Sequence, residues 1–472
     1  MKISGYLIIL ILFLFLATAF IYKSTAFLDP DFGWHITTGN IILHNGIPRQ
    51  DIFSYTMQGF PFIAHSWLSE ALFSILYPLI NYSGLAMLLG IVASFSLILS
   101  AYKNKLYFAL PILLLGASDI VAYIGVRPQV FSWLFFIALI QILFSHLSIR
   151  TKSLAVFAAI ALWSNLHAGF GIGVGIILLK CIYDFFYNKK SIKPSLALLL
   201  AALFGSVLNP YGIFIWKEVL FTFFNPDIRF GINEWLPGAL SLNFYLIPHL
   251  ALSLALVIKF RSLVGKFHKV LYIILFLGAM TSSKLYPFWS LYSVYVSIQI
   301  VSAFSDSLAD KLSKERLRIF LALIGVFSFL LFCLNFYNTL GWYKKYAEDS
   351  FYPSKAVQYL HVNLPEGNVF SLFAWGGYLI WKLPEKKVFV DGRMTYWNNL
   401  NPSANESKNA LKEHVNLLKG KENFVKAASK YNIDTVLMPR NDKTFEKVLK
   451  QMKKAGWKRI YQDNTAEIYS LL

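Results

Sequence analysis

The sequence predicts an α-helical polytopic membrane protein of about eleven transmembrane helices, with a small C-terminal α/β domain on the extracytoplasmic side. Of the 472 residues, 56% are hydrophobic and 15% are charged, and the mean hydropathy is +0.53. A soluble core of ordinary proportions cannot bury that much apolar surface. Beyond Gly341, charged residues become frequent, with 21 Lys and Arg against 13 Asp and Glu. Domains are therefore predicted at residues 1–341 and 342–472.

Long apolar runs define the predicted transmembrane helices. A helix needs about 20 residues to cross the hydrocarbon layer, and shorter helices can line a cavity. The first run contains Ala17-Thr18-Ala19, which is similar to a signal-peptide cleavage site, but in a multi-span protein such a run is more often retained as the first helix. The spans are predicted near residues 4–22, 84–102, 106–121, 128–146, 153–165, 168–187, 194–209, 244–259, 270–283, 286–304 and 318–340.

Basic residues in the connecting loops predict the orientation of the chain. One set of alternate loops contains 16 Lys and Arg residues, and the opposite set contains six. Short loops rich in Lys and Arg stay in the cytoplasm. The N-terminus is therefore predicted inside, while the first loop (residues 23–83), the 210–243 loop and the C-terminal domain are predicted outside a cell membrane that the chain crosses many times.

The apolar stretch Trp67–Ile80 has two interpretations. As a membrane span it would invert every later loop and destroy the charge pattern. Glu70 in its first turn and Pro78 near its end favour instead a juxtamembrane helix that lies in the interface. The first outer loop is therefore predicted to carry juxtamembrane helices.

The C-terminal residues show the alternation of a small α/β domain. Short runs rich in β-branched and aromatic residues predict strands at 369–371, 387–390, 435–438 and 458–461. Helical stretches are predicted near residues 353–363, 405–418, 422–431 and 443–455.

Two carboxylates, Asp29 and Asp31, follow the first predicted span and are separated by Pro30. Such a pair can clamp one hard divalent cation, Mg²⁺ or Mn²⁺, or can hold one carboxylate as a general base beside an acceptor hydroxyl. The alternative is structural, because Asp31 precedes a helix predicted over residues 32–44 and would cap it. That alternative leaves Asp29 unexplained. The helix is expected to end at Asn45-Gly46-Ile47-Pro48.

Most other unusual polar residues also fall on the predicted outer side. Polar groups at membrane depth are costly and tend to face a cavity, so an outward-opening pocket is expected. Arg127 opens a span and would grip a lipid phosphate through two parallel hydrogen bonds, or would simply snorkel. Glu234 and Trp235 suit a sugar ring, or belong to a solvated loop. The further candidates for substrate binding are His35, His65, Glu70, His167, Lys284, Asp391 and Arg393.

Four of these candidates also have structural interpretations. His167 lies in a very short turn between two spans, where a lone histidine is more often hydrogen-bonded to its neighbours, and Lys284 lies beside a span like Arg127. Asp391-Gly392-Arg393 is expected to form a glycine turn with a local ion pair.

Composition excludes two classes of protein. Cys181 and Cys333 lie in apolar runs, where a thiol packs as a small hydrophobic group, so no disulfide framework is predicted. The net charge of +19 is spread over short loops and the C-terminal domain, without the aromatic and basic modules of nucleic-acid-binding proteins. No nucleic-acid partner is expected.

These motifs give the chain a family resemblance. It resembles the GT-C superfamily of polytopic glycosyltransferases, which includes protein mannosyltransferases and the aminoarabinose transferases that modify lipid A, and it looks closest to a bacterial subgroup. The resemblance covers most of the chain. It rests on Asp29-Pro30-Asp31-Phe32-Gly33-Trp34-His35, Phe53-Ser54-Tyr55-Thr56, His65-Ser66-Trp67-Leu68-Ser69-Glu70, Arg127-Pro128-Gln129, Asn165-Leu166-His167, Asn209-Pro210-Tyr211-Gly212 and Asp391-Gly392-Arg393.

The resemblance implies an essential acid in the first outer loop, juxtamembrane helices in that loop, and a polyprenyl-phosphate sugar as donor. By position, Asp29 or Asp31 would be the acid and Trp67–Ile80 a juxtamembrane helix. Better-described members have a different acidic pair and a His-Pro-Pro element where this chain has His65-Ser66-Trp67. The identities of donor and acceptor therefore do not transfer.

The sequence thus predicts an inverting glycosyltransferase that takes its donor from the outer leaflet and modifies an envelope lipid, glycan or protein. Arg127, with Lys284 or His167, would hold the donor phosphate, and Asp29 or Asp31 would activate the acceptor. One rival is a lipid-linked sugar flippase, which needs polar groups along the whole crossing path. A second rival is a non-catalytic envelope assembly factor that binds polymers through its outer domain.

Overall fold

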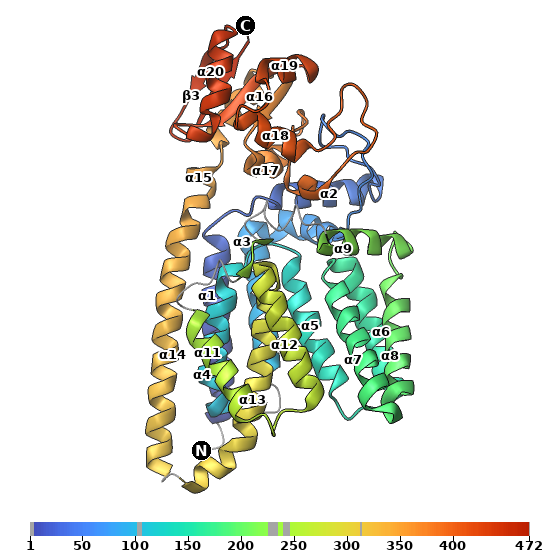
Figure 1. Ribbon diagram of the computed structural model, residues 1–472. Coiled ribbons are helices and arrows are strands. Elements are labelled where there is room, and N and C mark those ends of the chain that lie inside the picture. Colours follow the sequence, from blue (N-terminus) through green and yellow to red (C-terminus); the bar gives the residue numbers. More distant parts are fainter. Residues whose placement is uncertain (1–3, 102–105, 225–234, 239–245, 312–313, 472) are drawn as a thin grey trace. The chain divides into compact units, whose positions relative to one another are not determined.

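The computed structural model describes residues 4–101, 106–224, 235–238, 246–311 and 314–471 (Figure 1). The chain divides into two compact units, which we call the membrane unit and the α/β unit. The membrane unit comprises residues 1–26 and 80–342, and the α/β unit comprises residues 27–79 and 343–472.

The membrane unit is built from helices, and each of the eleven predicted spans lies on one of them. Among these helices, α6 packs against α8 and α4 packs against α13. The helices are α1 (Ser4–Thr25), the second part of α3 (Trp67–Ser100), α4 (Leu106–Ile120), α5 (Gln129–Leu143), α6 (Ile149–Leu166), α7 (Phe170–Tyr187), α8 (Ile192–Ser206), α9 (Ile215–Phe224), α11 (Ile247–Lys259), α12 (Lys266–Thr281), α13 (Tyr286–Lys311) and α14 (Lys314–Tyr343).

Within the described residues, four helices are both long enough and apolar enough to cross a bilayer by themselves. Three further apolar helices are shorter, and membrane helices of that length are tolerated where neighbouring helices cover them. These helices confirm a multi-pass membrane protein. The four long helices cover Leu7–Thr25, Trp67–Ser100, Phe170–Tyr187 and Ile319–Tyr346, and the shorter ones cover Ala109–Tyr123, Gln129–Leu143 and Ile247–Lys259.

Helix α3 contains a break at Asn81, whose backbone angles of φ 55° and ψ −172° are not helical. A continuous helix of 34 residues would extend about 51 Å, well beyond the hydrocarbon thickness. The division into units falls at the same place, after Leu79. We therefore treat Trp67–Ile80 as a separate arm and the residues after Asn81 as the membrane-spanning part.

The α/β unit contains a four-stranded mixed sheet in the order β1-β2-β4-β3. Strand β1 (Asn368–Ser371) pairs parallel to β2 (Ile433–Pro439), and β4 (Ala466–Ser470) pairs antiparallel to both β2 and β3 (Lys458–Gln462). The helices of this unit are α2 (Phe32–Asn45), the first arm of α3, α15 (Glu348–Phe351), α16 (Ser354–Val362), α17 (Gly376–Lys382), α18 (Ala410–Leu418), α19 (Phe424–Lys430) and α20 (Glu446–Lys454).

Most of the predicted elements of the C-terminal region are confirmed. Strands β1, β2 and β3 and helices α16, α19 and α20 lie where the sequence predicts them, and α18 occupies only the second half of its predicted range. Strand β4 and helix α17 were not predicted. Strand β4 pairs with β3 as the second arm of a hairpin.

The predicted strand at residues 387–390 is wrong. Val388 pairs with the first outer loop instead of the sheet: its N–H donates to the Phe53 carbonyl at 2.9 Å, and the Tyr55 N–H donates to its carbonyl at 3.2 Å. Its partner thus lies more than 300 residues away in the sequence, where no local pattern reveals it.

Further contacts make the first outer loop an integral part of the α/β unit. The Ser407 N–H donates to the Thr56 carbonyl at 2.7 Å, and the Tyr55 hydroxyl donates to the Val369 carbonyl at 3.0 Å. The loop that we assigned to the transmembrane domain therefore packs with the C-terminal residues.

Helices α2 and α17 approach closely at two glycines. A Cβ atom on Gly33 would lie 2.1 Å from the Gly377 carbonyl oxygen, and a Cβ on Gly377 would lie 2.2 Å from the Pro30 carbonyl oxygen. Neither distance is compatible with a side chain. This backbone contact fixes α2, which follows the acid pair, against the C-terminal part of the unit.

We expect Gly33→Ala to destabilise the α/β unit by about 1–3 kcal/mol, because the added methyl group overpacks a backbone contact. The midpoint of thermal unfolding of the full chain in detergent measures the effect. Gly175→Ala is the control, since a Cβ at this helical glycine meets no atom within 4 Å. An unchanged midpoint for Gly33→Ala would contradict the packing seen here.

Candidate functional site

The acid pair lies at the start of α2 in the α/β unit. Asp29 is buried, and its Oδ1 accepts a hydrogen bond from the Asp31 N–H at 2.9 Å. Asp31 is partly exposed, and its Oδ1 accepts from the Trp34 indole N–H at 3.0 Å. Asp31 is the residue before α2, but its side chain makes no capping hydrogen bond. The capping alternative is therefore wrong, and Asp31 is the more accessible carboxylate of the pair.

The carboxylate of Asp31 also contacts the turn Asp391-Gly392-Arg393. A Cβ atom on Gly392 would lie 2.0 Å from Asp31 Oδ1, so only a glycine leaves room for the carboxylate. The structure thus brings together two motifs that are separated by 360 residues in the sequence.

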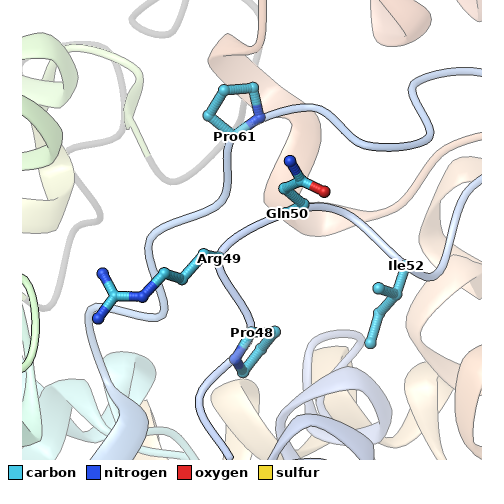
Figure 2. Close-up of a pocket in the computed structure, with 5 residues that line it drawn as sticks. All are labelled: Pro48, Arg49, Gln50, Ile52 and Pro61. Carbon is cyan, nitrogen blue, oxygen red and sulfur yellow. The ribbon is translucent and has the colours of Figure 1, made fainter.

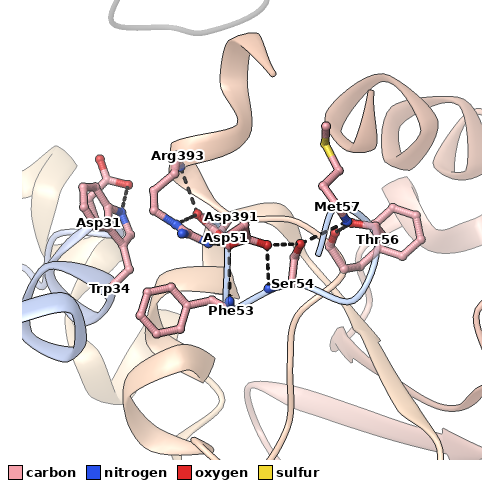
Figure 3. A network of polar contacts seen from close by, with 10 residues as sticks. Asp31, Trp34, Asp51, Phe53, Ser54, Thr56, Met57, Asp391 and Arg393 are labelled. Atoms are coloured by element: carbon pink, nitrogen blue, oxygen red, sulfur yellow. Dashed lines mark hydrogen bonds and ion pairs between the residues drawn. The ribbon is translucent and has the colours of Figure 1, made fainter. Parts of the chain in front are cut away.

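Arg393 is the centre of a buried ionic cluster (Figure 3). Its guanidinium lies 2.6 Å from Asp391 and 2.8 Å from Asp51, and all three side chains are buried. Asp391 also accepts from the Arg393 backbone N–H at 2.9 Å, as expected for a turn with a local ion pair. Rings of Phe53, Phe62 and Trp397 surround the guanidinium, at 4.7, 5.1 and 5.2 Å from its carbon.

Asp51 is one of the polar residues of the first outer loop, but the sequence analysis assigned it no role in catalysis or binding. Its carboxylate accepts from the backbone N–H groups of Phe53 and Ser54 at 3.2 and 3.0 Å, which orders the first outer loop, and it also binds Arg393. A carboxylate in a loop looks solvated from sequence alone, and only the long-range pairing with Arg393 gives it a role.

His35 and Glu70 form a second buried pair. His35 Nδ1 lies 3.1 Å from Glu70 Oε1, and the imidazole packs on the Trp34 indole with ring centroids 3.6 Å apart. Burial raises the pKa of Glu70 from 4.5 to about 8, although the positive charge of Arg393 partly opposes this. Trp34 therefore links this pair to Asp31.

We expect Glu70 to make the stability of the α/β unit pH-dependent. Its folded-state pKa is raised, so its contribution is fully present below pH 4.5 and is lost as the pH rises through about 8. Glu70→Gln, a neutral isostere whose amide can still donate to His35, should remove this dependence. Thermal midpoints measured from pH 5 to pH 9 check the prediction, and parallel pH curves for the two proteins would contradict it.

His65 lies in the turn that precedes α3 and is half-buried. Its backbone N–H donates to the Ile63 carbonyl at 2.8 Å. An open hollow of about 430 Å³ lies elsewhere in the same loop, lined by Pro48, Arg49, Gln50, Ile52 and Pro61 (Figure 2).

Three connecting segments that carry predicted cations meet at one end of the membrane unit. They join α4 to α5, α6 to α7 and α12 to α13, and they contain Arg127, His167 and Lys284. Tyr123 of the first segment stacks on Tyr286 beside the third, with centroids 6.1 Å apart. The Ser132 hydroxyl in the first turn of α5 lies 2.8 Å from His167 Nδ1.

His167 is held in one tautomer by its own turn. The backbone N–H of Gly169 donates to His167 Nδ1 at 3.0 Å, so this nitrogen is an acceptor and a neutral ring carries its proton on Nε2. The structural interpretation of His167 is therefore confirmed for Nδ1, while Nε2 is the nitrogen that suits a phosphate.

Lys284 lies over the Trp235 indole, with Nζ 5.0 Å from the ring centroid. A cation on an aromatic face is partly desolvated and attracted by the ring. Glu234 lies outside the described residues. Lys284 and Trp235, a phosphate candidate and a sugar candidate, are thus neighbours.

The predicted site residues fall into two groups, one in each unit. The α/β unit contains the carboxylates Asp29 and Asp31, the pair His35 and Glu70, and the ionic turn Asp391–Arg393. The membrane unit contains Arg127, His167, Lys284 and Trp235. Within the described residues, no three His, Cys, Asp or Glu side chains are grouped as around a metal ion. A divalent cation at Asp29 and Asp31 stays a prediction.

Comparisons with known proteins show which solved structure the fold of this chain is similar to. No family model matches the chain, and no curated protein matches it. Among solved structures, it is similar to the crystal structure of ArnT from Cupriavidus metallidurans bound to undecaprenyl phosphate, with a TM-score of 0.55 and 10% sequence identity. The alignment covers 98% of this chain and 97% of that one. The chain has the ArnT fold. The GT-C resemblance is thereby confirmed at the level of the fold.

The ArnT-like membrane unit also contains a polar cluster that the sequence analysis missed. Asp119 of α4 binds His249 Nδ1 of α11 and accepts from the Ser290 hydroxyl of α13 at 2.8 Å. Ser293 lies 3.0 Å from His249 Nε2. All four side chains are fully buried. Asp119 in a predicted span was the available signal, since an ionisable residue at membrane depth needs a partner.

Proposed function

We propose that the chain is a glycosyltransferase that moves a sugar from a polyprenyl-phosphate donor to an envelope lipid, glycan or protein at the outer face of the membrane. The observation that carries the proposal is the ArnT fold over 98% of the chain, since that ArnT structure holds undecaprenyl phosphate. The acid pair follows the first span in the sequence and lies against a buried ionic turn, which supports a catalytic rather than a transport role.

In this proposal Asp31 is the general base. Its partly exposed carboxylate takes the proton of an acceptor hydroxyl, while the hydroxyl oxygen forms a bond to the anomeric carbon of the sugar. The bond from that carbon to the phosphate oxygen breaks, and polyprenyl phosphate leaves with the electron pair. One displacement inverts the configuration, through an oxocarbenium-like transition state.

The other site residues bind or position in this proposal. Arg127, Lys284 and His167 Nε2 stabilise the negative charge of the departing phosphate, and Trp235, with Glu234, contacts the sugar. Asp29 holds the turn of Asp31 through its backbone N–H. The pair His35 and Glu70, the ionic turn Asp391–Arg393 and His65 belong to the wall of the acceptor site.

The direct experiment uses purified full-length protein with a radiolabelled polyprenyl-phosphate sugar in detergent and in proteoliposomes. Release of polyprenyl phosphate with transfer of label to an envelope extract supports the proposal, and mass spectrometry of envelopes from cells with and without the chain identifies the acceptor. Transbilayer movement of intact donor without bond cleavage would favour a flippase. Activity that persists in the presence of EDTA would exclude the proposed role of Mg²⁺ or Mn²⁺ in catalysis.

An assembly factor without catalysis is the other alternative. Its binding domain would have to include residues 27–79, because these pack with residues 343–472 in one unit. Binding experiments therefore need the full chain. Envelope binding that persists after replacement of both Asp29 and Asp31 by alanine, without any turnover in the unsubstituted protein, would favour this alternative.

A further inference from the structure

The net positive charge of residues 342–472 arises from one segment. Residues 419–459 contain twelve Lys and Arg but four Asp and Glu, whereas the other C-terminal residues, 342–418 and 460–472, contain nine of each. The entire excess of +8 in the C-terminal region thus falls within 41 residues. A lysine-rich surface selected only for solubility does not need this segregation.

Helix α20 displays much of this charge on one side. It buries Val448 and Met452, and the opposite surface carries lysines at a spacing of three and four residues. Of these, Lys450 pairs with Glu446 at 2.6 Å. In the described part of the chain, the following exposed lysines form no ion pair: Lys443, Lys447, Lys453 and Lys454.

The loop before α19 extends the same surface. A Cβ atom on Gly420 would lie 3.3 Å from Lys447 Cβ, so the α20 side chain lies against this loop. Lys419 and Lys421, which flank Gly420, are both exposed. We call the surface formed by Lys419, Lys421, Lys443, Lys447, Lys450, Lys453 and Lys454 the lysine face.

We propose that the lysine face binds a linear polyanion with regularly spaced phosphate groups, such as a phosphodiester-linked envelope polymer. Lysine ammonium groups are flexible point charges, which suit a mobile chain of phosphates better than one rigid ligand. Several cations in a row bind such a chain cooperatively and displace its counterions, whereas single phosphates gain little. That this polymer is the acceptor, or carries it, rests on the proposed function.

The lysine face and helix α2 lie at different ends of the α/β unit (Figure 1). Near α2, the Leu28 N–H donates to the Tyr346 carbonyl at 3.1 Å, and Phe32 packs on Tyr77 of the α3 arm. Helix α20 and strand β3 lie at the opposite end of this unit from α2 (Figure 1).

Binding of fluorescent long-chain polyphosphate to the full chain, in nanodiscs of phosphatidylcholine, tests the proposal. The variant K443Q/K447Q/K454Q should weaken binding by about tenfold or more, and salt should weaken it further. The control K355Q/K408Q/K412Q removes the same charge from exposed positions of the same unit and should leave binding within about twofold. The variant K443R/K447R/K454R should retain binding.

Three results would overturn the proposal: no measurable binding, equal losses in the two glutamine variants, or preferential binding of phosphatidylglycerol vesicles over polyphosphate. Donor cleavage assayed with a neutral acceptor should be unchanged in K443Q/K447Q/K454Q. Failure of that transferase assay in all proteins, with polyphosphate binding intact, would contradict the proposed function and leave the lysine face supported.

Discussion

Asp31→Asn should lower the rate of sugar transfer by about 10²–10⁴-fold, the usual contribution of a general base. Asparagine keeps the oxygen that accepts from the Trp34 indole, so the start of α2 should stay folded. What it loses is the ability to take a proton from the acceptor. The rate of polyprenyl-phosphate release under saturating donor measures this loss, and the thermal midpoint verifies the fold.

Asp29→Asn is the matched control, since it makes the same chemical change two residues away. Its amide oxygen can still accept from the Asp31 N–H, and its carboxylate is buried away from an acceptor. We expect less than about a tenfold loss of rate. A large loss in Asp29→Asn with full activity in Asp31→Asn would transfer the role of base to Asp29.

Arg393→Met should destabilise the α/β unit by about 3–5 kcal/mol, because it leaves the buried carboxylates of Asp51 and Asp391 without their counterion. Methionine is nearly as long as the aliphatic part of arginine, so it keeps much of the packing against Phe53, Phe62 and Trp397. The lost energy is therefore mainly electrostatic. Amide hydrogen exchange of strands β1 and β2 reports the stability of this unit separately from that of the membrane unit.

Arg459→Met is the control for this change. Arg459 also pairs with a carboxylate, Glu467 at 3.2 Å, but its side chain is 49% exposed. Solvent screens such a pair, so the cost should stay below about 1 kcal/mol. Similar losses of protection from hydrogen exchange in the two variants would show that the buried ionic cluster at Arg393 contributes no more to stability than the exposed pair of Arg459 and Glu467.

The local patterns that sequence analysis reads were sufficient for most of the architecture. Apolar runs located the helices of the membrane unit, and alternating apolar residues located β1, β2 and β3, because hydrophobic periodicity is a property of neighbouring residues. The same reasoning failed at residues 387–390, whose pairing partner, the first outer loop, is remote. At Asp31 it left a helix cap open as the structural alternative, whereas the carboxylate accepts from the Trp34 indole and lies against Gly392.

The candidate site also combines features that local sequence predicts with features that depend on remote partners. Residue chemistry alone singled out Asp29, Asp31, His35, Glu70 and Arg393 as unusual for their surroundings. The identity of their partners could not be predicted, because each pair joins elements far apart in the sequence. Asp51 was given no role for this reason, because its counterion, Arg393, is remote in the sequence. Asp119 was missed although its place in a predicted span was a signal.

The sequence by itself determined that this chain is a multi-pass membrane protein with acids after its first helix and a basic C-terminal region, because composition and apolar run length act locally. Only the tertiary structure decided that the first outer loop folds with residues 343–472, and that seven lysines of residues 419–459 form one face. Both features depend on long-range backbone contacts and ion pairs. These interactions form only when segments that are far apart in the sequence come together in the folded chain.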